Sequence, residues 1–246
     1  MIDPIIFAAG YSPALDYCIQ RLKETGLTIS SEPSHQITHL LLPVPSFSSD
    51  GNLIGGGDLK DILKQLPQNI IIVGGNLERE ELKGYNAYDL LQDEEYLALN
   101  AQITAHCAIK VALSQLPIVL EGCNSLVIGW GRIGKCLARL LRQVGADVTV
   151  CARKETDRSI LKALGYTAAN LDHIDPTAFR LIFNTVPTML LPECPGRALK
   201  IDLASRLGLG GEDVIWARGL PGKDAPESSG LLIADSFLSL LRKEPL

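Results

Sequence analysis

Residues 124–134 read Asn-Ser-Leu-Val-Ile-Gly-Trp-Gly-Arg-Ile-Gly. The first five residues predict a buried strand, and an amphipathic helix pattern, Arg132–Val144, begins inside the glycine segment. A GxGxxG spacing between a strand and a helix predicts dinucleotide binding, because backbone N–H groups and the helix dipole then face a pyrophosphate. Gly129 would permit the tight turn, Gly131 would let the backbone approach the phosphates, and Gly134 would let the helix pack on the strand. The cofactor-binding candidates in this turn are Gly129, Trp130, Gly131, Arg132, Ile133 and Gly134.

The strand after this helix, Asp147–Cys151, indicates which dinucleotide to expect. An acidic residue about 20 positions after the glycine segment would hold the ribose 2′-hydroxyl of NAD. Here Arg153 and Lys154 stand at that place, and the first carboxylate is Glu155. A guanidinium can pair with a 2′-phosphate and stack on adenine. The sequence therefore favours NADP, with NAD as the alternative cofactor. The alternative without a functional role is that Arg153 and Lys154 are ordinary surface cations.

Apolar runs and helix patterns alternate along the whole chain, which is typical of parallel sheets with helices on their faces. The strands predicted before the glycine turn are Pro4–Ala9, Leu27–Ser30, Thr38–Pro43 and Asn69–Val73, and the strands predicted after it are Asp147–Cys151, Leu181–Asn184, Leu199–Leu203 and Val214–Ala217. The other predicted helices are Pro13–Thr25, Asp58–Leu66, Glu94–Ser114, Asp157–Leu164 and Ser228–Leu241. The sequence thus predicts an α/β fold with two Rossmann-like domains, of which the second binds a dinucleotide.

We place the domain boundary inside the long helix, near Asn100. The prediction is a smaller, flavodoxin-like domain over residues 1–99 and an NAD(P)-binding Rossmann domain over residues 100–230. Residues 231–246 would form a C-terminal helix that packs back on the first domain.

The composition excludes several functions. Of the 246 residues, 46% are hydrophobic, and 23 Lys and Arg against 28 Asp and Glu give a net charge of −5. This balance argues against a nucleic-acid binder. No apolar run approaches the ~20 residues that cross a bilayer, and the N-terminus does not read as a secretory signal. The six cysteines lack metal-ligand spacing, so we expect reduced thiols, no metal and a cytoplasmic protein.

Several segments outside the glycine turn resemble one family, the A components of dipicolinate synthase. They are Gly129–Arg153, Phe183–Pro187, Ile201–Arg206, Gly219–Lys223 with Ala225, Pro226 and Gly230, and, in the first half, Leu42–Pro45, Asp50-Gly51 and Val73–Asn76. The resemblance implies a nicotinamide-dependent oxidoreductase similar in build to D-2-hydroxyacid dehydrogenases. It implies action on a dihydro or hydroxy-tetrahydro precursor of dipicolinate in sporulating bacteria. It also implies a homo-oligomer and, as partner, the flavoprotein-like B component of dipicolinate synthase.

The chain departs from the family pattern in its last crossover. The interval from Gly208 to Val214 is too short for the helix that usually precedes the last strand. Either the strand order or the connection is therefore expected to change.

Ligands of a doubly wound sheet bind beyond the carboxyl ends of its strands. The segment Asn184, Thr185, Val186 and Pro187 is expected near the nicotinamide, where its backbone groups would contact the cofactor. Arg206 follows the strand Leu199–Leu203, and its guanidinium could clamp a substrate carboxylate. The other substrate-binding candidates are Pro45, Ser46, Thr104, and Pro221, Gly222 and Lys223 from an expected loop, Gly219–Lys223.

Hydride transfer also needs a group that moves a proton. His106 is the only histidine expected near the cleft between the domains and is the candidate acid or base. Asp202 would orient Arg206 or the nicotinamide amide. Two other functions remain open: a non-catalytic NADP-binding or scaffold protein, and a 2-hydroxyacid dehydrogenase, whose usual Arg, Glu and His set is not visible here.

Overall fold

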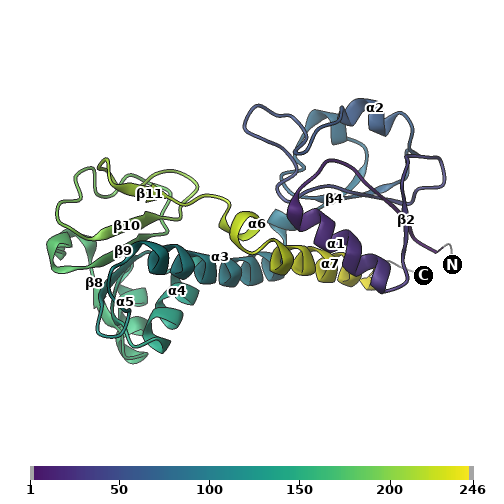
Figure 1. Ribbon diagram of the computed structural model, residues 1–246. Coiled ribbons are helices and arrows are strands. Elements are labelled where there is room, and N and C mark those ends of the chain that lie inside the picture. The colour runs from purple at the N-terminus through teal and green to yellow at the C-terminus, as the bar shows by residue number, and fades with distance from the viewer. Residues whose placement is uncertain (1–2, 244–246) are drawn as a thin grey trace. The chain divides into compact units, whose positions relative to one another are not determined.

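The computed structural model describes residues 3–243, which form two units, each with its own parallel sheet (Figure 1). One unit comprises the chain up to Asn100 together with the segment from Pro221 onward, and the other comprises Ala101–Leu220. The chain therefore changes unit after residues 100 and 220, where the sequence placed boundaries after residues 99 and 230. Helix α3 (Glu94–Gln115) contributes residues to both units.

The first unit has five parallel strands in the order β2-β1-β3-β4-β5. Its strands are β1 (Ile5–Ala8), β2 (Thr28–Ser30), β3 (His39–Leu41), β4 (Ile71–Gly74) and β5 (Asn86–Asp89), and its other elements are α1 (Pro13–Glu24), α2 (Leu59–Leu63), α7 (Pro226–Lys243) and the short 3-10 helices η1 (Glu80–Leu82) and η2 (Leu90–Gln92). This is the flavodoxin-like order 2-1-3-4-5. The sequence analysis missed β5 because its residues, Asn-Ala-Tyr-Asp, show no apolar run.

Helix α7 packs along α1 in the first unit (Figure 1). The two helices approach closely at Gly230, where a Cβ atom would lie 2.4 Å from the carbonyl oxygen of Ala14. Further along α7, the fully buried ring of Phe237 meets the ring of His39 edge-on, with 5.4 Å between their centroids. The C-terminal segment thus supplies core to a sheet formed from the opposite end of the chain. Residues 244–246 of the predicted C-terminal segment lie outside the described residues.

The second unit has six parallel strands in the order β11-β10-β9-β6-β7-β8. Its strands are β6 (Asn124–Ile128), β7 (Asp147–Cys151), β8 (Thr167–Ala169), β9 (Leu181–Asn184), β10 (Leu199–Asp202) and β11 (Val214–Trp216), and its other elements are α4 (Arg132–Gln143), α5 (Glu155–Ala163) and the 3-10 helices η3 (Leu171–His173) and η4 (Pro176–Ala178). With β6 counted as the first strand, this is the Rossmann order 3-2-1-4-5-6. The predicted α/β fold with two Rossmann-like parallel sheets is therefore confirmed.

The connections that follow β8 differ from those of an ordinary Rossmann sheet. Between β8 and β11 the described chain contains two short 3-10 helices and no α-helix. Apolar residues of these connections pack against the sheet instead, including Leu171, Leu190 and Leu209, which share a core with Ile128 and Ile182. The change expected in the connection to β11 is thus a loop without a helix, and the strand order is kept.

The segment Gly219–Lys223, predicted to be a loop, is instead part of a short helix, α6 (Leu220–Asp224). Proline is tolerated in the first turn of a helix, where its missing N–H would have no partner, so Pro221 does not prevent this helix.

No helix between residues 3 and 243 is both long enough and apolar enough to cross a membrane.

Replacing Phe237 by alanine tests the packing of α7. Removal of a fully buried aromatic ring should lower the free energy of unfolding by about 3–5 kcal/mol, which urea denaturation followed by circular dichroism would measure. Leu231→Ala is the control, because Leu231 lies on the same helix and is 38% exposed. Equal losses in the two variants would show that α7 is not part of the core.

Candidate functional site

A cavity of about 690 Å³ lies at the carboxyl ends of the strands in the second unit. Its lining follows four strands: Gly129, Trp130 and Gly131 after β6, Ala152, Arg153 and Lys154 after β7, Asn170, Leu171 and Asp172 after β8, and Val186, Thr188 and Leu190 after β9. Strand β6 pairs with β7 on one side and β9 on the other, so the cavity lies where the strand order reverses. This is the position at which doubly wound sheets bind ligands.

The three glycines of the turn after β6 meet different surroundings. Gly129 has φ 108°, donates its N–H to the carbonyl oxygen of Cys151 over 2.9 Å, and has no room for a Cβ, which would lie 2.3 Å from the Thr185 hydroxyl. A Cβ at Gly134 would lie 2.2 Å from the carbonyl oxygen of Gly129. A Cβ at Gly131, by contrast, would meet no heavy atom within 4 Å. The fold itself needs the first and third glycines, whereas Gly131 leaves space for something outside the chain.

The N-terminus of α4 opens at this space. Gly131 is the N-cap of the helix, and no side chain caps the first turn. The first N–H groups of a helix lack partners within the helix, and together with the helix dipole they favour an anion. The turn therefore fits the pyrophosphate of a dinucleotide, and its neighbours Trp130, Arg132 and Ile133 follow the same short path between β6 and α4.

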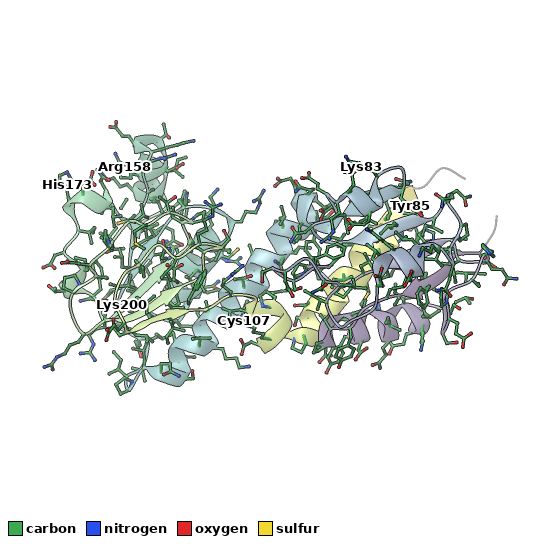
Figure 2. The ribbon with its side chains drawn as sticks, turned by 90° about the horizontal axis from the view of Figure 1, so that it is seen from above. Lys83, Tyr85, Cys107, Arg158, His173 and Lys200 are labelled. Atoms are coloured by element: carbon green, nitrogen blue, oxygen red, sulfur yellow. The ribbon has the colours of Figure 1, made fainter. Side chains whose placement is uncertain are left out.

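Arg153 and Lys154 are exposed and line the same cavity, at the end of β7. The turn that presents them is fixed by Arg158, whose Nη1 donates to the carbonyl oxygens of Ala152 (2.8 Å) and Arg153 (2.7 Å); Arg158 is labelled in Figure 2. The carboxylates of Asp157 and Asp172 also reach the lining, so this part of the cavity carries both signs of charge.

Cys151, the last residue of β7, is among the residues that line the cavity, and its side chain is buried. Burial raises its pKa to about 12, so the thiol stays protonated at neutral pH and is a poor nucleophile. All six cysteines of the chain are free thiols. Among residues 3–243, no group of three or more His, Cys, Asp or Glu side chains could hold a metal ion.

Asn184 and Asp202 lie side by side at the ends of β9 and β10, and both are fully buried. Asn184 Nδ2 donates to Asp202 Oδ2 over 2.9 Å. The remaining hydrogen bonds of both side chains go to backbone groups of the loops that follow the two strands. Arg206 is exposed and is not one of the four groups that donate to Asp202. Asp202 thus makes its hydrogen bonds to groups within the protein. The sequence suggested instead that it orients Arg206 or the nicotinamide amide.

The other candidates from the second unit are dispersed. Of the segment after β9, Val186 lines the cavity, Thr185 holds the glycine turn by donating its hydroxyl to the Ile128 carbonyl over 2.9 Å, and Pro187 is exposed. On α3, Thr104 is buried and His106 is exposed. Neither of these side chains nor Arg206 lines the cavity.

The candidates from the first unit show the same contrast between buried and exposed groups. Ser46 is fully buried, and its hydroxyl donates to the Pro43 carbonyl (2.8 Å) and accepts from the Gly75 N–H (3.0 Å). Pro45 is exposed. On α6, Pro221 is half-buried, and Gly222 and Lys223 are exposed. A role of these residues in substrate binding stays a prediction.

Sequence reasoning missed nine residues that line the cavity: Ile128, Cys151, Ala152, Asp157, Asn170, Leu171, Asp172, Thr188 and Leu190. Asn170 and Asp172 follow β8, whose three residues, Thr-Ala-Ala, give no strand signal, so the polar residues after it could not be assigned to the carboxyl edge of the sheet. Thr188 and Leu190 reach the cavity only through the path of the loop after β9.

The comparisons with known proteins agree with this architecture. No protein-family model matches the chain. The chain is 25% identical to the A component of dipicolinate synthase from Bacillus subtilis (strain 168) over 239 residues, which cover 87% of this chain and 80% of the relative. The crystal structure of the A component of dipicolinate synthase from Bacillus halodurans matches with a TM-score of 0.82 at 20% identity, over 100% of this chain and 99% of that one.

A more distant fold match is the NADPH-dependent glyoxylate/hydroxypyruvate reductase of Sinorhizobium meliloti, with a TM-score of 0.53 at 13% identity over 98% of this chain and 95% of that one. The resemblance seen in the sequence is therefore confirmed. The chain is similar to the A component of dipicolinate synthase over most of its length, and it shares its fold with that protein and with the glyoxylate/hydroxypyruvate reductase.

Proposed function

We propose that the chain is an NADP-dependent oxidoreductase that acts on a cyclic dicarboxylate, such as a dihydro precursor of dipicolinate. The proposal of NADP as cofactor rests on one observation. The open turn at Gly131 and the cations Arg153 and Lys154 line the same cavity, at the switch point of a Rossmann sheet. The substrate class rests on the 25% identity to the A component of dipicolinate synthase.

Different residues of the chain would bind different parts of NADP. The backbone of Gly129–Gly131 and the first turn of α4 would hold the pyrophosphate. Arg153 and Lys154 would hold the 2′-phosphate, and the apolar surfaces of Trp130 and Leu171 would exclude water. Bound NADP supplies a nicotinamide ring that gives or takes a hydride.

Each hydride that moves to or from a C–N bond is accompanied by a proton that moves between the substrate and a base. His106 is exposed and can exchange a proton with solvent, and the exposed guanidinium of Arg206 can pair with a substrate carboxylate. We assign these two roles to His106 and Arg206. The relative is named as one component of a synthase, which suggests the B component as partner.

One observation favours a second candidate, a protein that binds NADP without turning over a substrate. Asn184 and Asp202, two residues expected at the reacting end, are fully buried, and their side chains make their hydrogen bonds inside the protein.

A turnover assay separates the two functions. The chain would be incubated with a dihydrodipicolinate precursor and NADP, with and without the B component of a dipicolinate synthase, and the absorbance of the reduced nicotinamide would be followed. Turnover that requires the chain supports the oxidoreductase. NADP binding by calorimetry without turnover in either mixture would support the second candidate, and absence of binding would contradict both.

Arg153→Asp should change the choice of cofactor. The substitution removes one charged hydrogen bond to the 2′-phosphate and adds repulsion, so the Kd for NADP should rise about ten- to hundredfold. The Kd for NAD, which has no 2′-phosphate, should change little. Titration calorimetry with both nucleotides measures this difference.

Arg139→Asp is the matched control, because Arg139 is exposed on α4 and does not line the cavity. It carries the same change of charge and should leave the ratio of the two affinities unaltered. If Arg153→Asp also left that ratio unaltered, Arg153 would not contact the 2′-phosphate.

Two glycine variants should separate binding from folding. Gly131→Ala adds a Cβ in open space at an N-cap, so the free energy of unfolding should fall by at most about 1 kcal/mol, while NADP binding should weaken strongly. Gly134→Ala places a Cβ against the Gly129 carbonyl and should cost about 1–3 kcal/mol of stability. Urea denaturation and NADP titration of both variants measure the two effects. Unchanged NADP affinity in Gly131→Ala would mean that no phosphate approaches this turn.

A further inference from the structure

Asp202 is a buried carboxylate with an unusually large set of donors. Its Oδ1 accepts from the N–H of Ala204 (3.0 Å), and its Oδ2 accepts from the N–H groups of Gly208 (2.7 Å) and Leu209 (3.1 Å) and from Asn184 Nδ2 (2.9 Å). A carboxylate offers about four lone-pair sites, and this one accepts four donors, three of them on Oδ2. The side chain therefore joins two loops, the one after β9 and the one after β10.

Every residue that the loop after β9 contributes to the cavity is connected to this carboxylate. Asn184 accepts from the Val186 N–H over 3.1 Å and donates to the Val186 carbonyl over 3.0 Å. The Val186 carbonyl in turn accepts from the Thr188 N–H (2.9 Å), and the Gly208 carbonyl accepts from the Leu190 N–H (2.8 Å). A chain of hydrogen bonds that starts at Asp202 thus reaches all three residues of this loop that line the cavity: Val186, Thr188 and Leu190.

The two loops also touch where hydrogen bonds hold them. A Cβ at Gly208 would lie 2.5 Å from Asn184 Nδ2 and 2.6 Å from the Thr188 carbonyl oxygen. On the other side, the loop after β9 contacts the glycine turn, because a Cβ at Gly129 would lie 2.9 Å from a methyl carbon of Val186. The position of this loop consequently sets the width of the cavity between Val186 and the turn.

Lys200 lies two residues before Asp202 on the same face of β10 and has a different role. It is 3% exposed and labelled in Figure 2, and its Nζ donates to both carboxylate oxygens of Asp213, at 2.9 and 2.8 Å. This ion pair ties the connection to β11 onto the sheet. None of its bonds leads to the loop after β9.

We propose that Asp202 is a positioning residue for the nucleotide: it acts through Asn184 and Gly208 to hold the cavity wall formed by Val186, Thr188 and Leu190. This role rests on the proposed function, since it assumes that the cavity takes NADP. Asp202 itself does not touch the cofactor. Its effect is to hold the wall in place before binding, so that the nucleotide does not have to order the loop.

Asp202→Asn tests the proposal with little change of volume. The amide keeps one acceptor oxygen, so it can serve either the three donors of Oδ2 or the single donor of Oδ1, and the donors on the other side face an NH₂ group. At a temperature where the variant is fully folded, its Kd for NADP should be about tenfold or more above the wild-type value. Amide hydrogen exchange of residues 185–191, measured without nucleotide, should become faster.

Lys200→Met is the matched control, because it removes a buried polar group from the same strand and face. It should lower the melting temperature while leaving both the Kd for NADP and the exchange of residues 185–191 unchanged. Gly208→Ala is a second variant in case Asp202→Asn does not fold. Gly208 does not have positive φ, so its backbone conformation accepts alanine; the added Cβ would push against Asn184 and the carbonyl oxygens of Val186 and Thr188, and it should also weaken NADP binding.

The outcomes are distinct. Wild-type NADP affinity in folded Asp202→Asn and in Gly208→Ala would overturn the proposal, as would an equal loss of affinity in Lys200→Met. If the wild-type chain binds no NADP, the proposed function fails, and hydrogen exchange decides the positioning role alone: unchanged exchange of residues 185–191 in Asp202→Asn would overturn that too.

Discussion

When loops rather than helices cover a sheet, the buried N–H and C=O groups of those loops need hydrogen-bond partners. This constraint determines how the second unit is built. A helix satisfies its own N–H and C=O groups, but a buried loop does not. In the second unit, the connections from β8 to β11 lack α-helices, and their apolar residues still cover the sheet. The strands underneath therefore carry two buried polar side chains, Asn184 and Asp202, that bond to the backbone of these loops in places where a helix-covered parallel strand would be apolar.

The first unit meets the same constraint at the carboxyl edge of its sheet. Asp89, the last residue of β5, accepts from the N–H groups of Asn76, Leu77 and Leu91. The buried hydroxyl of Ser46 joins the loops after β3 and β4 through Pro43 and Gly75. In both sheets, short polar side chains at strand ends fix the loops from which a binding site would be built. Such buried groups are stabilising only while every donor keeps its partner.

Much of the fold could be predicted from the chain. The strand, turn and helix around Gly129–Gly134 could be predicted from residue type and spacing. Strands β6, β7 and β9 lie at the predicted residues. Arg153, Lys154 and the glycine turn line one cavity, as the parallel strand order requires, because both follow the carboxyl ends of neighbouring strands. Strands β5 and β8 were missed because three or four residues of mixed polarity carry no periodic signal.

The sequence by itself determined the fold class, the glycine turn and the family resemblance, because these depend on residue type and spacing along short segments. Only the tertiary structure decided what Asp202, Asn184 and Ser46 do, since a polar residue after a strand can face either a ligand or a neighbouring loop. The loops that cover the second sheet have no helical period, and their path is fixed by bonds between residues such as Asp202 and Gly208 that belong to the folded chain alone. Local patterns therefore predicted the elements, and the hydrogen bonds between distant loops determined which side chains remain available for chemistry.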